Sequence, residues 1–124
     1  MKKINLMIFG TVLLGSLISS CSKEEETVAV ATVAVAPVAA FTASTTSGNT
    51  PLSVTFTNTS TNATRYEWDF GDGSTSTESS PSHTFSNLST TSARSFTVTL
   101  KAFDAGTGTN STTRSINVEA KKNP

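Results

Sequence analysis

From residue 38 onward, apolar residues alternate with polar residues, most of them serines and threonines, at a spacing of two. The alternating sets are Leu52, Val54 and Phe56; Tyr66, Trp68 and Phe70; Phe96, Val98, Leu100 and Ala102; and Ile116 and Val118. Because successive side chains of a β-strand point to opposite faces, each set predicts a strand with one buried face. No stretch keeps the spacing of an amphipathic helix over three turns. The pattern predicts an all-β fold with these residues as its core.

Turn-forming residues separate the alternating segments. Gly, Pro, Asn, Asp and Ser gather at residues 48–51, 58–62, 71–73, 79–81 and 105–108. Short strands divided by turns at intervals of about ten residues are typical of a β-sandwich. A folded unit of about 80 residues buries only roughly 60–65% of its unfolded surface, so it has little room for a deep active site. This size favours a single non-catalytic domain.

Residues 68–73 read Trp-Asp-Phe-Gly-Asp-Gly, the hallmark of polycystic kidney disease (PKD) domains, and the chain resembles this family over residues 38–119. The matching segments are Phe41 to Ala43, Gly48 to Phe56, Ser80 to Phe85, Phe96 to Ala102, and a last strand that ends at Ile116 and Val118. The resemblance implies a seven-stranded immunoglobulin-like β-sandwich. The chain departs from the family at residues 87–94, where a longer Ser/Thr-rich loop replaces a tight glycine turn and leaves the loop's shape open.

The hallmark also has a direct physical interpretation. Trp68 is the largest apolar side chain available to fill the space between two sheets, and Phe70 shares its face. Asp69 and Asp72 fall in a turn where short carboxylates cap backbone N–H groups, and Gly71 or Gly73 can adopt a positive φ angle there. We therefore expect residues 68–73 to be a folding motif first, with a ligand site as the alternative.

The first 20 residues have the order of a signal peptide: Lys2 and Lys3, an apolar run to Ile18, then small residues. The run of about 15 residues is shorter than the roughly 20 that a spanning helix needs, and a retained membrane anchor is the alternative. Residues 17–21, Leu-Ile-Ser-Ser-Cys, resemble the lipobox of bacterial lipoproteins. The resemblance implies cleavage before Cys21, a diacylglycerol thioether on its sulfur and a fatty acyl chain on the new N-terminus.

Several acyl chains anchor a protein stably, whereas a single chain is marginal. Cys21 is the only cysteine, so the chain cannot form an intramolecular disulfide. Residues 22–26, Ser-Lys-Glu-Glu-Glu, resemble a surface-export signal, which implies an outer-membrane lipoprotein exposed at the cell surface. The alternatives are a solvated tether base and a domain that faces the periplasm.

We expect four regions along the chain. Residues 1–20 form the signal peptide, residues 21–37 the lipidated cysteine and a Val/Ala spacer, residues 38–119 the sandwich, and residues 120–124 a short tail. The spacer contains the five-residue repeats Val-Ala-Val-Ala-Thr and Val-Ala-Val-Ala-Pro, and Pro37 marks its end.

Charge and composition exclude several functions. The nine basic and nine acidic residues balance, and loss of Lys2 and Lys3 with the signal leaves seven against nine. Without a basic stripe, we expect no nucleic-acid partner. Ser and Thr occupy 35 of the 74 positions from Thr42 to Ser115, which suits strands and hydroxyl-lined loops.

The chain also offers few catalytic side chains. His83 is the only histidine, which excludes a hydrolase triad and a zinc site, and we expect it to make a structural hydrogen bond. A paired-carboxylate site would draw on Asp69, Asp72, Glu78 or Asp104, but the thin sandwich does not favour one. Asp69, Asp72 and Asp104 are weak calcium candidates, because the chain has no dense Asp/Asn repeat.

We therefore predict no catalytic residues and no cofactor beyond the lipid on Cys21, with calcium as an option. The expected role is that of a membrane-anchored module that contacts a protein or polysaccharide, or that serves as a spacer or assembly unit. The alternative is a dedicated glycan-binding lipoprotein, assisted by calcium. An exposed aromatic row would favour that alternative, and only Phe103 is predicted to face outward.

Overall fold

The computed structural model describes residues 33–122. The predicted signal peptide, Cys21 and residues 22–32 lie outside the described residues. The description below concerns the unit that begins at residue 35. Among residues 33–122, no helix is long and apolar enough to cross a membrane.

The described residues form eight strands. They are β1 (Phe41–Ala43), β2 (Ser47–Gly48), β3 (Leu52–Asn58), β4 (Arg65–Asp69), β5 (Thr75–Ser76), β6 (Ser82–Phe85), β7 (Arg94–Phe103) and β8 (Thr109–Val118). The predicted all-β sandwich is confirmed. The resemblance implies seven strands, and β2 and β5, with two residues each, are the short elements that the alternating pattern does not reveal.

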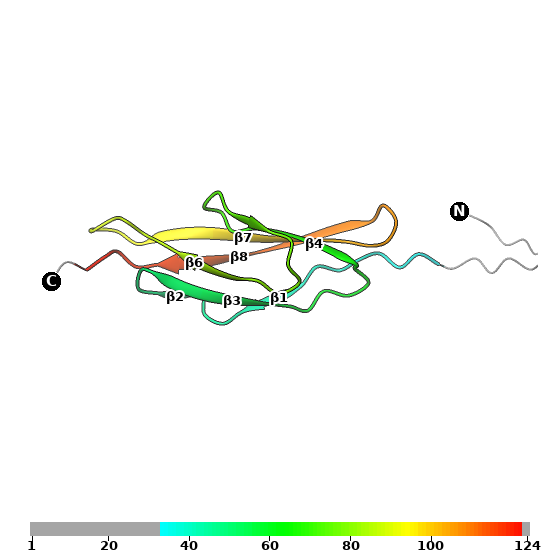
Figure 1. The fold of residues 1–124 in the computed structure, drawn as a ribbon, viewed down its shortest axis with the longest axis horizontal. Coiled ribbons are helices and arrows are strands. Elements are labelled where there is room, and N and C mark those ends of the chain that lie inside the picture. Colours follow the sequence, from blue (N-terminus) through cyan, green and yellow to red (C-terminus); the bar gives the residue numbers. More distant parts are fainter. Residues whose placement is uncertain (1–32, 123–124) are drawn as a thin grey trace, which may run out of the picture. The chain divides into compact units, whose positions relative to one another are not determined.

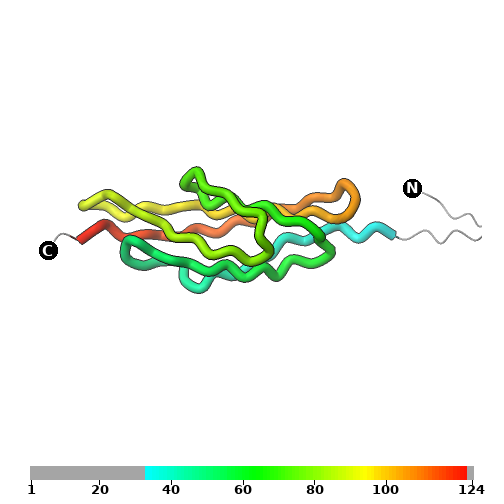
Figure 2. Tube along the Cα trace, viewed as in Figure 1, coloured from blue at the N-terminus to red at the C-terminus, as the bar shows by residue number. Residues whose placement is uncertain are grey.

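The strands form two layers, which Figure 1 shows one above the other. One sheet has the order β1-β3-β6, and the other has the order β2-β8-β7-β4-β5. All pairs are antiparallel except β2 with β8, which run parallel. Figure 2 shows that β7 and β8 form one long hairpin, and that residues 35–38 enter the unit near its turn.

The core lies between the two sheets, and the predicted inward sets line it. Its buried residues are Ala39, Phe41, Val54, Phe56, Trp68, Phe70, Phe85, Phe96, Val98, Leu100, Ala102, Ile116 and Val118. Two predicted core residues, Leu52 and Tyr66, are only partly buried. Trp68 sits at the centre, with its ring 5.1 Å from Phe41 and 5.6 Å from Phe56 between centroids. Its Nε1–H donates to the Glu78 carbonyl at 2.9 Å, so the indole is both packed and hydrogen-bonded.

The loop at residues 87–94 is organised by one buried amide. Asn87 is 2% exposed. Its Nδ2 donates to the carbonyls of Ser92 and Val118 at 2.9 Å, and its Oδ1 accepts from the Ser89 N–H at 3.0 Å. Because these bonds join the loop to the end of β8, a side chain takes the place of the family's glycine turn in fixing this connection.

Candidate functional site

The hallmark residues form a tight turn between β4 and β5. Asp69 Oδ1 accepts from the Gly71 N–H at 2.9 Å, and Asp72 Oδ1 accepts from the Ser74 N–H at 3.0 Å. Gly71 and Gly73 have φ angles of 80° and 97°, in the region that favours glycine. Both carboxylates are therefore engaged in holding the turn.

The close approach of β7 also requires glycine at position 71. A Cβ atom at this position would lie 2.5 Å from the Thr97 carbonyl oxygen on β7, whereas a Cβ at Gly73 would meet nothing within 4 Å. The turn thus packs its backbone directly against β7 at Gly71. This contact sets how closely the turn can approach the sheet.

Asp72 and His83 connect the hallmark turn to the other sheet. Asp72 Oδ2 lies 2.7 Å from His83 Nε2, and their side chains are 21% and 18% exposed. The His83 ring stacks on Phe70, with centroids 4.1 Å apart and an interplanar angle of 6°, and meets Phe85 edge-on at 4.7 Å. The lone histidine is thus held on three sides by structural contacts.

Opposing effects set the pKa of the Asp72 carboxyl. Partial burial raises the pKa, while hydrogen bonds from His83 and from the Ser74 N–H lower it. The hydrogen bonds prevail, and the pKa of Asp72 lies below its usual range. Asp72 is therefore a stabilised carboxylate, whereas a general acid needs a raised pKa.

The three calcium candidates are not brought together. On β4, Asp69 lies opposite Thr99 of β7. Asp104 directly follows Phe103, which lies opposite Arg65 at the other end of β4. Asp104 is thus five residues beyond Thr99, about 17 Å along β7. Its Oδ1 accepts from the N–H groups of Gly106 and Gly108 at 2.7 and 2.9 Å, so it closes the β7–β8 turn. Within residues 33–122, no three His, Cys, Asp or Glu side chains are grouped to hold a metal ion.

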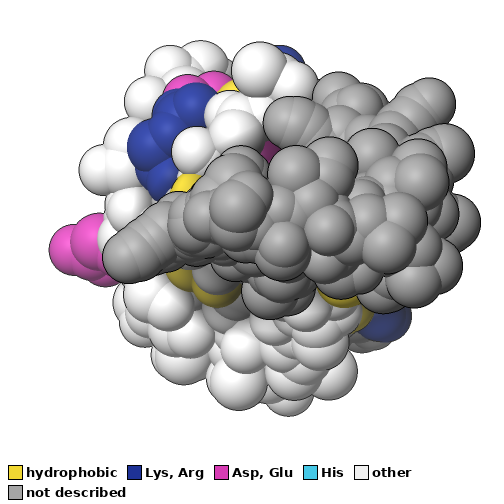
Figure 3. Space-filling view, turned by 90° about the vertical axis from the view of Figure 1, so that its right-hand side faces the viewer, with side chains coloured by type: hydrophobic (Ala, Val, Ile, Leu, Met, Phe, Trp, Pro, Cys, Tyr) yellow, Lys and Arg dark blue, Asp and Glu magenta, His cyan; other side chains and the backbone are white. Residues whose placement is uncertain are grey.

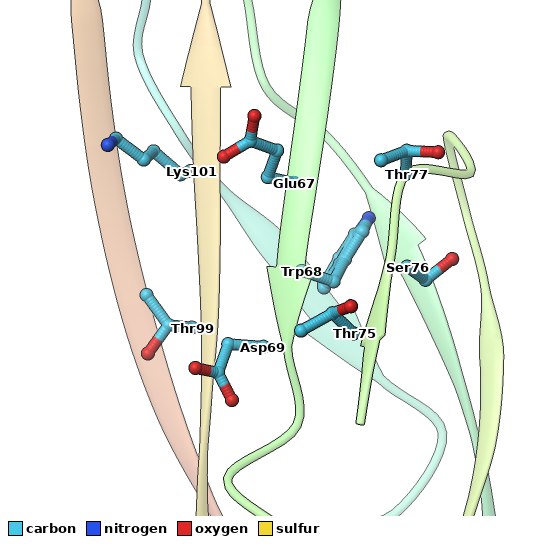
Figure 4. A pocket seen from close by; sticks show the side chains of 8 residues that line it. All are labelled: Glu67, Trp68, Asp69, Thr75, Ser76, Thr77, Thr99 and Lys101. Atoms are coloured by element: carbon cyan, nitrogen blue, oxygen red, sulfur yellow. The ribbon is translucent and has the colours of Figure 1, made fainter. Parts of the chain in front are cut away.

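A shallow groove of about 470 Å³ crosses the outer face of the five-stranded sheet (Figure 4). We call it the β4–β7 groove; it is lined by Glu67, Trp68, Asp69, Thr75, Ser76, Thr77, Thr99 and Lys101. In the register of β4 with β7, Glu67 lies opposite Lys101 and Asp69 lies opposite Thr99. Both signs of charge and several hydroxyls therefore line one surface. Trp68 also borders the groove, but it is itself 1% exposed and its ring packs in the core. Sequence reasoning missed this groove, because β5 is too short to be recognised from its pattern.

Phe103 faces outward, as predicted, but basic side chains flank its ring. The Arg65 guanidinium lies 3.7 Å from the ring centroid, and the Lys101 ammonium lies 5.2 Å from it. Arg65 also pairs with Glu67 at 2.6 Å. A cation stacked on an aromatic ring stabilises it at the surface but reduces the area that is free for a ligand. Phe103 is therefore a small platform beside the groove.

These features define an immunoglobulin-like β-sandwich closed by a Trp-Asp-Phe-Gly-Asp-Gly turn. A family model described as "PKD domain" matches residues 34–119, and the chain belongs to this family. No curated protein is similar enough to the chain to count as a match.

Solved structures give the same assignment. The chain is 36% identical to the PKD1 domain of the Vibrio cholerae metalloprotease PrtV, covering 68% of this chain and 99% of that domain, with a TM-score of 0.56. It is 37% identical to the PKD1 domain of Vibrio anguillarum Epp, covering 71% and 99%, with a TM-score of 0.56. A structure of carbohydrate-binding modules from the β-sandwich superfamily is 29% identical, covering 72% of this chain and 36% of that one, with a TM-score of 0.57.

Proposed function

We propose that the chain is a non-catalytic contact module of the bacterial cell envelope. In this proposal, diacylglycerol and fatty acyl groups on Cys21 hold it in the outer membrane, with the sandwich displayed at the cell surface. There it contacts a protein or a polysaccharide, or spaces and assembles other envelope components. Membership of the PKD family supports a module of this kind.

One observation carries the non-catalytic assignment: the histidine and three aspartates that sequence analysis singled out all make contacts that build the fold. His83 is stacked on Phe70 and paired with Asp72. Asp69, Asp72 and Asp104 each accept hydrogen bonds from backbone N–H groups. An acid–base pair needs groups that are free to exchange protons with a substrate. These contacts instead favour a structural role for each of them.

The sequence of residues 17–21 supports the anchor, and the end at which residues 35–37 enter the unit supports display of the domain. Residues 35–37 enter the unit at the end that carries the β7–β8 turn, while residues 119–122 leave at the opposite end (Figure 1). A tether attached at one end presents the other end, together with both outer faces, to the surroundings. Such an arrangement suits display.

The anchor is tested by growing cells with labelled palmitate. The parent chain is expected to incorporate the label, and Cys21→Ala is expected to lose it and to be released from the membrane. A second variant, Ser22→Ala, keeps the cysteine and serves as the control, which should remain labelled. Label retained in Cys21→Ala would overturn lipidation at this residue.

A second candidate function is glycan binding, and the β4–β7 groove favours it. Its hydroxyl, carboxylate and ammonium groups can hydrogen-bond the hydroxyls of a sugar, and Phe103 adds a small apolar surface beside them. The similarity to carbohydrate-binding modules of the β-sandwich superfamily supports the same idea. In Figure 4, the side chains of Glu67, Asp69, Thr99 and Lys101 all lie on the outer side of the sheet.

Affinity electrophoresis of the full chain through gels that contain bacterial or algal polysaccharides tests this candidate. The double variant Glu67→Gln, Lys101→Ala should lose roughly tenfold in affinity, since a charged hydrogen bond contributes about 1.5–3 kcal/mol. Thr57→Ala, on the exposed face of β3, is the matched control and should bind like the parent. Equal binding by all three would overturn the groove as the site. Repeating the electrophoresis with added calcium and with a chelator shows whether the ion raises the affinity.

A further inference from the structure

One side of strand β8 lacks a partner along most of its length. On one side, β8 pairs with β7 at every residue from Thr109 to Val118. On the other side, β2 covers only Asn117 and Val118. Within the described part of the chain, residues 109–115 therefore form an open edge of the five-stranded sheet. We call this stretch the β8 free edge.

The hydrogen-bonding groups of the β8 free edge can be assigned from the neighbouring bonds. The Asn117 N–H donates to the Thr46 carbonyl, and the Glu119 N–H donates to the Gly48 carbonyl, both at 2.8 Å and both away from β7. The register with β7 is unbroken, so no bulge shifts the alternation. Residues 109, 111, 113 and 115 therefore direct their N–H and C=O groups outward.

Natural sheet edges are usually protected by lysines, prolines, bulges or inward-pointing charges. The β8 free edge reads Thr-Asn-Ser-Thr-Thr-Arg-Ser and contains no Lys or Pro. Its one inward-pointing charge is Arg114, but the guanidinium is held at β1, where it donates to the Phe41 carbonyl at 3.5 Å and lies 5.8 Å from the Phe41 ring, so it does not project from the edge. The edge is thus long, regular and open to another strand.

We propose that a second copy of this chain occupies the edge, with the two β8 strands antiparallel across a twofold axis at Thr112. The β2 strand limits the edge at one end, and the turn at residues 104–108 limits it at the other. An antiparallel pair centred on Thr112 uses the whole free stretch. Ser111 then hydrogen-bonds with the partner's Thr113, and Thr109 with the partner's Ser115. The two five-stranded sheets become one continuous sheet.

The side chains suit a copy of the same strand better than a foreign one. In this register Arg114 faces the partner's Asn110, so the two arginines do not oppose each other. Threonines and serines meet across the outer face, and cross-strand hydroxyl pairs stabilise antiparallel sheets. The edge has no row of charges that would select an acidic or basic peptide. At the end of the unit that Figure 3 faces, where the edge begins after the β7–β8 turn, white polar side chains and backbone predominate over charged ones among the described residues.

Disulfide trapping tests the pairing. Thr112 pairs with its own copy at a non-hydrogen-bonded position, where Cα atoms are about 4.5 Å apart. That spacing is within the range that a disulfide bridges. The full chain carrying Thr112→Cys, treated with a mild oxidant in intact cells, is expected to form a disulfide-linked dimer. The parent chain shows the background from Cys21, and Thr57→Cys, on the exposed face of β3, is the matched control.

A second change separates strand pairing from chance collision. Thr113→Pro removes an N–H that points away from β7, so the β7–β8 hairpin should keep its hydrogen bonds. A chain that carries both Thr112→Cys and Thr113→Pro should therefore no longer form the disulfide-linked dimer. If circular dichroism shows that the proline variant is unfolded, Ser111→Lys with Thr113→Lys replaces it, since lysines then face each other across the seam. Three results would overturn the proposal. Thr112→Cys could give no more dimer than Thr57→Cys, the proline or lysine change could leave the amount of dimer unchanged in a folded chain, or Thr112→Cys could form cross-links only to other proteins.

Discussion

Asp72 and His83 join the two sheets of the sandwich through a contact of 2.7 Å between Oδ2 and Nε2. Asp72 belongs to the turn that follows β4, in the five-stranded sheet, and His83 lies in β6, in the three-stranded sheet. The same aspartate caps the Ser74 N–H. One side chain thus holds both the hallmark turn and the connection between the layers.

This contact predicts a loss of stability in acid. The pKa of Asp72 lies below its usual range in the folded chain and near 3.9 in the unfolded chain. A lowered pKa gives stability that is fully present above the unfolded pKa and is lost as the pH falls through the folded pKa. Urea unfolding below about pH 4 should therefore show a steeper loss in the parent than in Asp72→Asn. Equal slopes would contradict this role of Asp72.

The two hallmark glycines should differ in their tolerance of alanine. Both have positive φ angles, so either substitution adds strain of about 1–3 kcal/mol. Gly71→Ala also drives a Cβ into the Thr97 backbone, while Gly73→Ala meets open space. Thermal melts should rank the parent first, Gly73→Ala second and Gly71→Ala last. The opposite order of the two variants would show that the turn does not pack on β7 as described.

Trp68 should be the most sensitive core position. Trp68→Ala removes the ring that contacts Phe41 and Phe56, and large-to-small changes of this kind cost about 3–5 kcal/mol. Trp68→Phe keeps most of the packing and loses the bond to the Glu78 carbonyl, so its loss should be smaller. Chemical denaturation of both variants measures the difference. A Trp68→Ala chain that unfolds at the parent's midpoint would contradict the assignment of Trp68 as the core's centre.

Asn87 and Leu88 are neighbours in the chain, but we expect their alanine substitutions to affect stability very differently. Asn87→Ala removes the bonds that its amide makes to the Ser92 and Val118 carbonyls and to the Ser89 N–H, and each lost hydrogen bond costs about 0.5–1.5 kcal/mol. Leu88 is 87% exposed, so Leu88→Ala should change stability by less than about 0.5 kcal/mol. Urea midpoints test the pair. The polar residue should matter more than the apolar one, and the reverse would refute the proposed role of Asn87.

Most of the fold could be predicted because its longer strands are recognised from local patterns of apolar and polar residues. Strands β3, β4 and β7 alternate, β8 does so only at Ile116 and Val118, and the Trp68 motif indicates the sandwich from the sequence alone. Strands β2 and β5 could not be found this way, since two residues cannot establish a period, and their positions depend on pairing with β8 and β4. Asn87 was missed for a related reason: its burial depends on the end of β8, 31 residues away. Likewise, the sequence shows that Asp104 is a carboxylate but not that it lies at the far end of the sheet.

In the function proposed above, Cys21 anchors this PKD domain where it faces the outside of the cell. Protease shaving of intact cells tests this proposal. The parent is compared with one triple variant, Glu24→Gln with Glu25→Gln and Glu26→Gln, and a periplasmic protein is the control for lysis. We expect the parent to be degraded while the periplasmic marker survives, and the triple variant to be protected. Protection of the parent in unbroken cells, together with degradation after the outer membrane is opened, would contradict surface display and place the domain in the periplasm.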